Sequence, residues 1–102
     1  DVEEYDTKGV EKRFKKDGVV ELLEKGKIAL ANCASFDIET VEKSYRDLID
    51  ELGIKGGDII HPTRLALSGK TVGPGLFDII SILGKEKCIE RINKAIYYIK
   101  NL

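Results

Sequence analysis

Apolar residues recur three and four positions apart along most of this chain, which is the spacing of one face of an α-helix. The clearest stripe consists of Ile38, Val41, Tyr45, Leu48, Ile49 and Leu52. Asp37 and Ser35 are candidate N-cap residues for this helix, and Gly53 stands where a helix commonly ends. The pattern predicts an amphipathic helix over residues 37–52.

Two further stretches have a similar helical pattern. One spans Gly18–Cys33 with Asp17 as its candidate N-cap. Gly26 weakens that helix by about 1 kcal/mol relative to Ala, so a break at this residue is an alternative. The last helix spans Lys85–Lys100, and its apolar face is formed by Cys88, Ile89, Ile92, Ala95, Ile96 and Ile99. The charged stretch Val10–Lys16 is expected to form a short helical turn.

Glycines and two prolines punctuate the middle of the chain. The Gly56-Gly57 pair predicts a loop. Because proline is tolerated in the first turn of a helix, a short helix is expected to begin at His61 or Pro62 and to end before Gly69. The next helix, with Gly73 near its N-cap, is expected to end at residue 83. Since no strand pattern is found, the chain is predicted to be all-α, a single helical bundle of five to six helices with short connections.

The size of the chain limits its organisation. It has 102 residues, 42% of them apolar, which suffices for one hydrophobic core. No apolar run approaches the ~18–20 residues of a transmembrane helix, so no membrane partner is expected. Met is absent even from position 1, and we interpret the chain as an excised C-terminal fragment of a larger protein. Residues 1–16 are expected to form a linker or short helical lead-in, and residues 17–102 a helical domain.

The two cysteines favour a reducing environment. Cys33 and Cys88 lie far apart, and neither has a Cys or His at metal-ligand spacing. Both occupy apolar positions of predicted helices, so buried free thiols in the cytoplasm are favoured over a disulfide.

The sequence contains no recognisable catalytic constellation. It has no nucleophile paired with a base, no phosphate-binding loop, no dinucleotide fingerprint and no metal-ligand cluster. The chain alone is therefore predicted to be non-catalytic, without catalytic residues, a metal or a cofactor of its own.

Charge is distributed unevenly along the chain, although the net charge is only −1. Residues 1–50 hold 13 acidic and 9 basic side chains, a net charge of −4, whereas residues 51–102 hold 5 acidic and 8 basic ones, a net charge of +3. This asymmetry indicates that the second half faces a polyanion. The candidate phosphate contacts are Lys70, Lys87 and Arg91, with Lys85 and Lys94 beside them. The alternative is an ordinary solvated helix face.

The best candidates for recognition are Arg64 and a corner formed by Gly73, Pro74, Gly75 and Leu76. The planar guanidinium of Arg64 can stack on a base or pair with a base edge or a phosphate. The glycines of the corner allow close approach to the backbone, the proline fixes its geometry, and the N–H groups that open the next helix are free to donate. Leu76 offers an apolar surface for a base. The alternatives are a surface arginine paired with a carboxylate, and a plain helix N-terminus. His61, the only histidine, is expected to be a capping or surface group, and a phosphate contact or a pH-sensing role is the alternative.

These segments resemble a known family. Residues 62–69 read Pro-Thr-Arg-Leu-Ala-Leu-Ser-Gly, and residues 73–78 read Gly-Pro-Gly-Leu-Phe-Asp. They are similar to the patterns Pro-Leu-Arg-x-Ala-Leu-Thr-Gly and x-Pro-Gly-Leu-Phe-Glu in the C-terminal anticodon-binding domain of bacterial-type glutamyl-tRNA synthetases, which are class I glutamate–tRNA ligases. The similarity continues to residue 95 through a Leu-Gly-Lys-Glu run and a basic amphipathic helix.

The resemblance implies that the RNA partner is the anticodon loop of glutamate tRNA. It assigns Arg64 to the second anticodon base, and the corner residues Gly73, Pro74 and Leu76 to the third. Many relatives have Thr at the position of Gly73, so only backbone recognition is expected at that point. The arginine that serves the first base belongs to a preceding domain, so first-base specificity is expected to be missing from this fragment.

The resemblance also implies a role in protein biosynthesis. The domain would contribute tRNA binding and identity to an ATP-dependent aminoacylation, while ATP would bind in a catalytic domain that this fragment lacks. A cytoplasmic monomer in contact with its own upstream domains is expected. One alternative is a helical protein–protein interaction module without RNA specificity. Another is a helix-turn-helix DNA-binding protein, which would need a recognition helix richer in Arg, Lys, Asn and Gln than residues 76–83.

Overall fold

The computed structural model describes residues 2–102, and within that range it contains helices and no strand. In chain order the elements are α1 (Thr7–Gly9), the π-helical turn η1 (Val10–Phe14), α2 (Val19–Ala31), α3 (Ile38–Leu52), α4 (Gly56–Ser68), α5 (Leu76–Leu83) and α6 (Lys85–Lys100). The predicted all-α class is confirmed.

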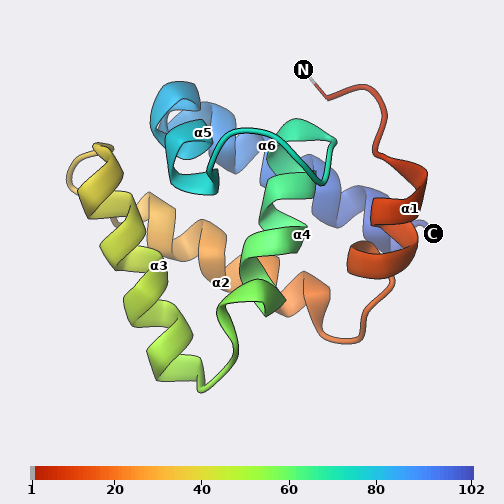
Figure 1. The fold of residues 1–102 in the computed structure, drawn as a ribbon, viewed down its shortest axis with the longest axis horizontal. Coiled ribbons are helices and arrows are strands. Elements are labelled where there is room, and N and C mark those ends of the chain that lie inside the picture. Colours follow the sequence, from red (N-terminus) through yellow and green to blue (C-terminus); the bar gives the residue numbers. More distant parts are fainter. Residues whose placement is uncertain (1) are drawn as a thin grey trace.

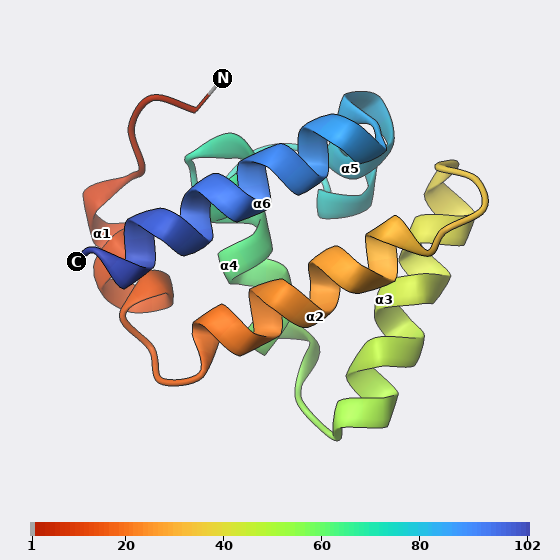
Figure 2. The same ribbon diagram turned by 180° about the vertical axis from the view of Figure 1, so that it is seen from behind.

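Helix α4 runs through the middle of the bundle and contacts α2, α3, α5, α6 and η1 (Figure 1). Seen from behind, α2 and α6 lie side by side in front of α4 (Figure 2). Helices α3 and α5 pack on each other at one end of the molecule, and α1 with η1 lies at the other end, beside the C-terminus (Figure 1). The core therefore has α4 at its centre.

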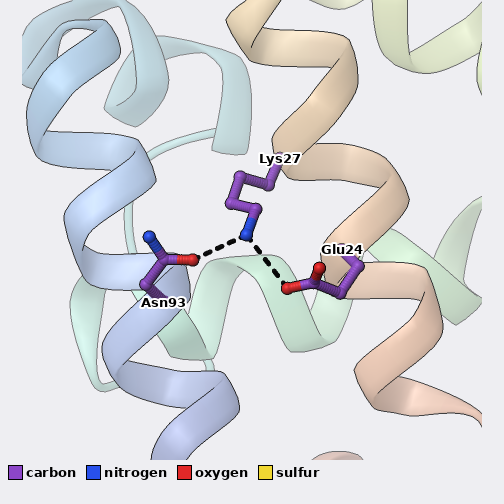
Figure 3. A network of polar contacts seen from close by, with 3 residues as sticks. All are labelled: Glu24, Lys27 and Asn93. Atoms are coloured by element: carbon purple, nitrogen blue, oxygen red, sulfur yellow. Dashed lines mark hydrogen bonds and ion pairs between the residues drawn. The ribbon is translucent and has the colours of Figure 1, made fainter.

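A polar network links α2 and α6 across their contact. The Nζ atom of Lys27 donates hydrogen bonds to Glu24 Oε1 at 3.0 Å and to Asn93 Oδ1 at 2.8 Å (Figure 3). Such partly exposed pairs contribute about 0–1 kcal/mol. Burial of Leu23 in α2 and Ile92 in α6 stabilises the same contact more strongly, by about 1.5–3 kcal/mol for each side chain.

Helix α3 begins at Ile38, one residue after its predicted start, and ends at Leu52 as predicted. The Oδ2 atom of Asp37 accepts a hydrogen bond from the N–H of Thr40 at 3.1 Å, which caps the helix. Hydrogen bonds from the side chain of Ser35 and from the side chain and backbone of Thr40 lower the pKa of Asp37 to about 2. Gly53, with φ 65°, ends the helix as predicted. Helix α6 has the predicted bounds.

Helix α2 differs from its prediction at both ends, and its last residue is Ala31 rather than Cys33. It begins at Val19 with Gly18, rather than Asp17, at the N-cap, and no side chain caps it. Gly18 has φ 82°, and this left-handed turn sets the direction in which the helix starts. The helix continues through Gly26 without a break.

The predicted start of α4 was wrong. The helix begins at Gly56 rather than at position 61 or 62, so the Gly56-Gly57 pair forms its first turn instead of a loop. The carboxylate of Asp58 accepts a hydrogen bond from the N–H of Lys55 at 3.2 Å, satisfying a donor at the helix start. Pro62 therefore lies in the helix interior, where it costs about 3 kcal/mol. That cost is offset by burial of the α4 side chains Ile59, Pro62, Leu65 and Leu67, each worth about 1.5–3 kcal/mol.

Helix α5 ends at Leu83 as predicted, but it begins at Leu76 with Gly75, rather than Gly73, at the N-cap. The connection between α4 and α5 is therefore a loop over residues 69–75, the 69–75 loop.

The N-terminal segment packs onto the other helices. Val10 and Phe14 are buried in the same core as α2, α4 and α6. The ring of Tyr5 lies 4.7 Å from that of Tyr98, and the N–H of Asp6 donates to the carbonyl oxygen of Gly69 at 2.8 Å. The expected helical turn at residues 10–16 is found at 7–14, in α1 and η1. The division of the chain between residues 16 and 17 remains a prediction.

Both cysteines are buried free thiols, as predicted. Burial raises the pKa of Cys88 to about 11, so this thiol stays protonated near neutral pH. Within residues 2–102, no helix combines the length and the apolar character that a bilayer crossing requires.

Candidate nucleic-acid interface

The structure brings together the two features that the sequence singled out. Arg64, on α4, is half-buried, and its Nη1 atom donates a hydrogen bond to the carbonyl oxygen of Pro74 in the 69–75 loop. Among residues 2–102 the Arg64 guanidinium forms no ion pair. The alternative of a surface arginine paired with a carboxylate is therefore not found. A guanidinium has five N–H donors, and those not used by Pro74 remain available to a ligand.

The 69–75 loop is held at its base and open at its tip. The hydroxyl of Ser68 donates to the carbonyl oxygen of Arg64 at 2.8 Å and accepts from the N–H of Lys70 at 3.2 Å. Gly73 has φ 139°, a conformation that favours glycine, and a β-carbon placed on it would meet nothing within 4 Å. The backbone at Gly73 is therefore accessible to a ligand.

The N-terminus of α5 forms the other side of the corner. Gly75 is its N-cap without a side-chain hydrogen bond, so N–H groups of the first turn are free to donate. A β-carbon on Gly75 would lie 3.0 Å from Asp78 Oδ2, which places a carboxylate beside this helix start. That negative charge disfavours a phosphate here, so the corner suits the edge of an uncharged base better.

The exposed apolar surface of the corner differs from the prediction. The side chain of Leu76 is only 2% exposed and packs in the core. Val72 is 77% exposed at the loop tip, and Pro74 is exposed beside it. Val72 and Pro74 therefore provide the apolar surface in this conformation, and Val72 was not among the residues predicted from the sequence. An apolar residue between the helix-ending glycine and the Gly-Pro-Gly corner could have indicated it.

The predicted phosphate contacts fall into two groups. Lys70 and Lys87 are exposed, and neither forms a side-chain hydrogen bond or ion pair within the described residues. Arg91 instead donates from Nη1 to the carbonyl oxygen of Leu67 at 2.7 Å. Lys85 and Lys94 likewise donate to backbone carbonyl oxygens, those of Cys33 at 2.7 Å and Val2 at 2.6 Å. Arg91, Lys85 and Lys94 therefore hold parts of the fold together.

A second group of basic side chains lies next to the Arg64 helix, where the sequence pattern did not predict one. Lys8, Lys12, Arg13 and His61 line a hollow of about 490 Å³ together with Asp6, Gly9 and Thr71. Partial burial lowers the pKa of His61, and the nearby charges of Arg13, Arg64 and Lys12 lower it further. The run of basic residues from Lys12 to Lys16 was the available indication, but it fell in the expected lead-in.

Within residues 2–102, no three His, Cys, Asp or Glu side chains are grouped so that they could hold a metal ion. The arrangement offers hydrogen-bond donors, positive charge and a small apolar surface, which are the means by which proteins recognise single-stranded RNA.

Comparison with known proteins decides the family. The family model described as "Anticodon binding domain" matches residues 1–96. The chain belongs to this anticodon-binding domain family. This finding confirms the resemblance on which the sequence analysis relied.

The relatives of this anticodon-binding domain are glutamate–tRNA ligases. It is 55% identical over 98 residues to the glutamate–tRNA ligase of Desulforudis audaxviator, covering 94% of this chain and 20% of that protein. It is 51% identical over 102 residues to glutamate–tRNA ligase 2 of Thermoanaerobacter pseudethanolicus, covering all of this chain and 21% of that protein. The chain thus spans about a fifth of the length of these curated relatives.

A solved structure supports the same conclusion. The crystal structure of a glutamate tRNA ligase from Elizabethkingia meningosepticum in complex with its amino acid matches the anticodon-binding domain with a TM-score of 0.88 and 31% identity. The match covers 94% of this chain and 19% of that one. The helical bundle is therefore the fold of the corresponding part of a glutamate tRNA ligase.

Proposed function

We propose that this domain binds the anticodon loop of glutamate tRNA and reads its second and third bases. The observation that carries the proposal is the hydrogen bond from Arg64 to the carbonyl oxygen of Pro74, because it joins the two predicted recognition elements into one surface. The membership in the anticodon-binding domain family and the glutamate–tRNA ligase relatives support tRNA as the ligand.

Arg64 is proposed to contact the second anticodon base. One N–H of its guanidinium is engaged by Pro74, which restricts the side chain before RNA arrives. Less conformational entropy is then lost on binding. The remaining donors of the planar fork can pair with a base edge, or the plane can stack on a base.

The corner is proposed to contact the third base through Gly73, Pro74, Gly75 and the backbone of Leu76, since the side chain of Leu76 is buried in the core. The accessible backbone at Gly73 and the free N–H groups at the start of α5 provide hydrogen-bond partners, and the exposed Val72 and Pro74 provide an apolar surface. Recognition at Gly73 uses backbone atoms, because this residue has no hydroxyl to contribute.

Lys70 and Lys87 are proposed to add sequence-independent contacts to phosphates, since both are exposed and unpaired among residues 2–102. Arg91 remains a candidate for such a contact, but its bond to Leu67 already uses part of its guanidinium. Each phosphate contact adds salt-dependent affinity.

The wider role follows from the family. The domain is proposed to act in the cytoplasm as a monomeric part of a glutamate–tRNA ligase, in contact with the upstream domains of that enzyme. ATP-dependent aminoacylation would take place in those upstream domains. Single exposed apolar side chains such as Ile82 are common on monomers and give no support to a protein–protein interaction module.

An NMR titration of the isotope-labelled domain with a glutamate-tRNA anticodon stem-loop tests the proposal. Shifts are expected at Arg64, Lys70 and residues 73–77, and they should weaken with a loop altered at the second and third bases. The amides of α3 around Lys43, on an exposed face of another helix, are the internal control. Equal shifts for both loops, or shifts confined to α3, would contradict the proposal.

A further inference from the structure

The hollow between the N-terminal segment and α4 is lined by basic side chains from two distant parts of the chain. Lys8, Lys12 and Arg13 come from α1 and η1, and His61 comes from α4. Within residues 2–102, none of these three cations forms a hydrogen bond or an ion pair, unlike their neighbour Lys15, which pairs with Glu11.

Like charges surround the imidazole of His61. Partial burial lowers the pKa of His61, and the nearby charges of Arg13, Arg64 and Lys12 lower it further, which disfavours the protonated form. Asp6 is the acidic residue that lines the hollow, and its carboxylate already caps α1 by accepting from the N–H of Gly9 at 2.8 Å. The hollow therefore keeps a net positive charge, which an anion would neutralise.

The position of the hollow indicates which anion it receives. His61 lies three residues before Arg64 on α4, and positions three apart share one helix face. Thr71 lines the hollow and belongs to the 69–75 loop, so the hollow borders the surface to which Arg64 and Pro74 contribute. An RNA strand whose bases face Arg64 would pass its backbone over these cations.

We propose that the hollow of Lys8, Lys12, Arg13 and His61 binds phosphate groups of the RNA backbone next to the anticodon. This inference rests on the proposed function. It assigns to the N-terminal segment a part in RNA binding, and it makes that contact independent of base identity.

The test compares salt dependence and specificity. Affinity for the glutamate-tRNA anticodon stem-loop and for the loop altered at the second and third bases is measured over a series of salt concentrations. The salt slope is the slope of the logarithm of the affinity against the logarithm of the salt concentration. Lys12→Gln is expected to lower its magnitude by about 0.7, as for the loss of one phosphate contact to a single strand. Lys12→Gln/Arg13→Gln is expected to lower it by about 1.4, as for the loss of two such contacts. Both variants should weaken binding of the two loops by the same factor.

Lys43→Gln is the matched control, because Lys43 is an exposed lysine on α3 whose partner is Asp47. It should leave affinity and slope unchanged. A second readout is the pKa of His61 followed by NMR, which should rise when the stem-loop binds because a phosphate favours the imidazolium. This measurement needs no substitution and so does not depend on the folding of a variant.

The outcomes separate the inference from the proposed function. If the unaltered domain distinguishes the two loops but Lys12→Gln/Arg13→Gln keeps its salt slope and the pKa of His61 stays constant on binding, the phosphate site is overturned and the proposed function stands. If the unaltered domain binds neither loop, the proposed function fails and this inference fails with it.

Discussion

The hydroxyl of Tyr45 lies directly against the backbone of Gly26. A β-carbon placed on Gly26 would be 2.6 Å from Tyr45 Oη and 3.2 Å from the ring carbon that carries it. Tyr45, in α3, is fully buried, so its ring cannot move away without disturbing the core. Gly26 is therefore required by the close approach of α3 to α2 rather than by a break in α2.

Gly26→Ala is expected to destabilise the domain despite the better helix propensity of alanine. The higher helix propensity of alanine stabilises the folded domain by about 1 kcal/mol, whereas overpacking against a rigid core destabilises it by about 1–3 kcal/mol. We expect a net loss of free energy of unfolding in urea denaturation. The control is Gly56→Ala at the start of α4, where the nearest atoms lie at 3.6 Å and no loss is expected. A Gly26→Ala variant as stable as Gly56→Ala would contradict this packing.

Tyr45→Phe is expected to leave the free energy of unfolding unchanged or to raise it. The buried Oη atom of Tyr45 forms no hydrogen bond of good geometry among residues 2–102, although the Thr63 hydroxyl lies near it. Thr63 donates its own proton to the carbonyl oxygen of Ile59 at 2.6 Å. An unpaired buried hydroxyl costs about 1–3 kcal/mol, and phenylalanine removes it without a cavity. Chemical denaturation measures the effect. A loss above about 1 kcal/mol would show that the hydroxyl is hydrogen-bonded in solution.

Arg91→Gln is expected to reduce stability by about 1.5–3 kcal/mol, because it removes a charge-assisted hydrogen bond from α6 to the end of α4. Lys87→Gln, one turn earlier on α6, should change stability by less than about 0.5 kcal/mol since Lys87 is exposed. Urea unfolding of both variants checks the difference. Equal stability would mean that Arg91 does not hold α4 and α6 together.

Acid should weaken the N-terminus of α3 in a defined pH window. Hydrogen bonds lower the pKa of Asp37 from 3.8 to about 2, so the folded state favours the carboxylate. The resulting stability is present above pH 3.8 and is lost as the pH falls from 3.8 through about 2. Asp37→Asn keeps a capping oxygen without a charge and should lose less stability over that window. Unfolding monitored by circular dichroism at several pH values measures the free energy of unfolding of the unaltered domain and of Asp37→Asn. The same dependence on pH in both proteins would contradict the role of Asp37.

The sequence predicted best those helices whose ends have local causes. Helix α3 was placed correctly because its apolar stripe is regular and both its caps, Asp37 and Gly53, are sequence neighbours of the helix. The start of α4 was missed because two glycines and Pro62 are unfavourable in a helix interior. Tertiary burial of the α4 side chains overrides that local preference, and burial depends on residues far away in the sequence.

The candidate site was likewise predicted only where its features have local causes in the sequence. Arg64 and the Gly73–Leu76 corner stand ten residues apart and could be found from a local pattern, and the structure places them in contact. The exposure of Val72 and the burial of Leu76 depend on the turn by which the 69–75 loop enters α5. The basic hollow joins residues 8–13 to His61, a juxtaposition that only the folded chain creates.

The affinity of the domain for two RNA loops, measured with and without Arg64→Lys, tests the central claim most directly. The lysine keeps the charge but loses the planar fork. We expect the unaltered domain to prefer the glutamate-tRNA anticodon stem-loop over a loop changed only at the second base. Arg64→Lys should remove about 1–3 kcal/mol of that preference while binding to the changed loop stays nearly constant. An undiminished preference in Arg64→Lys, or the absence of any preference in the unaltered domain, would contradict the account.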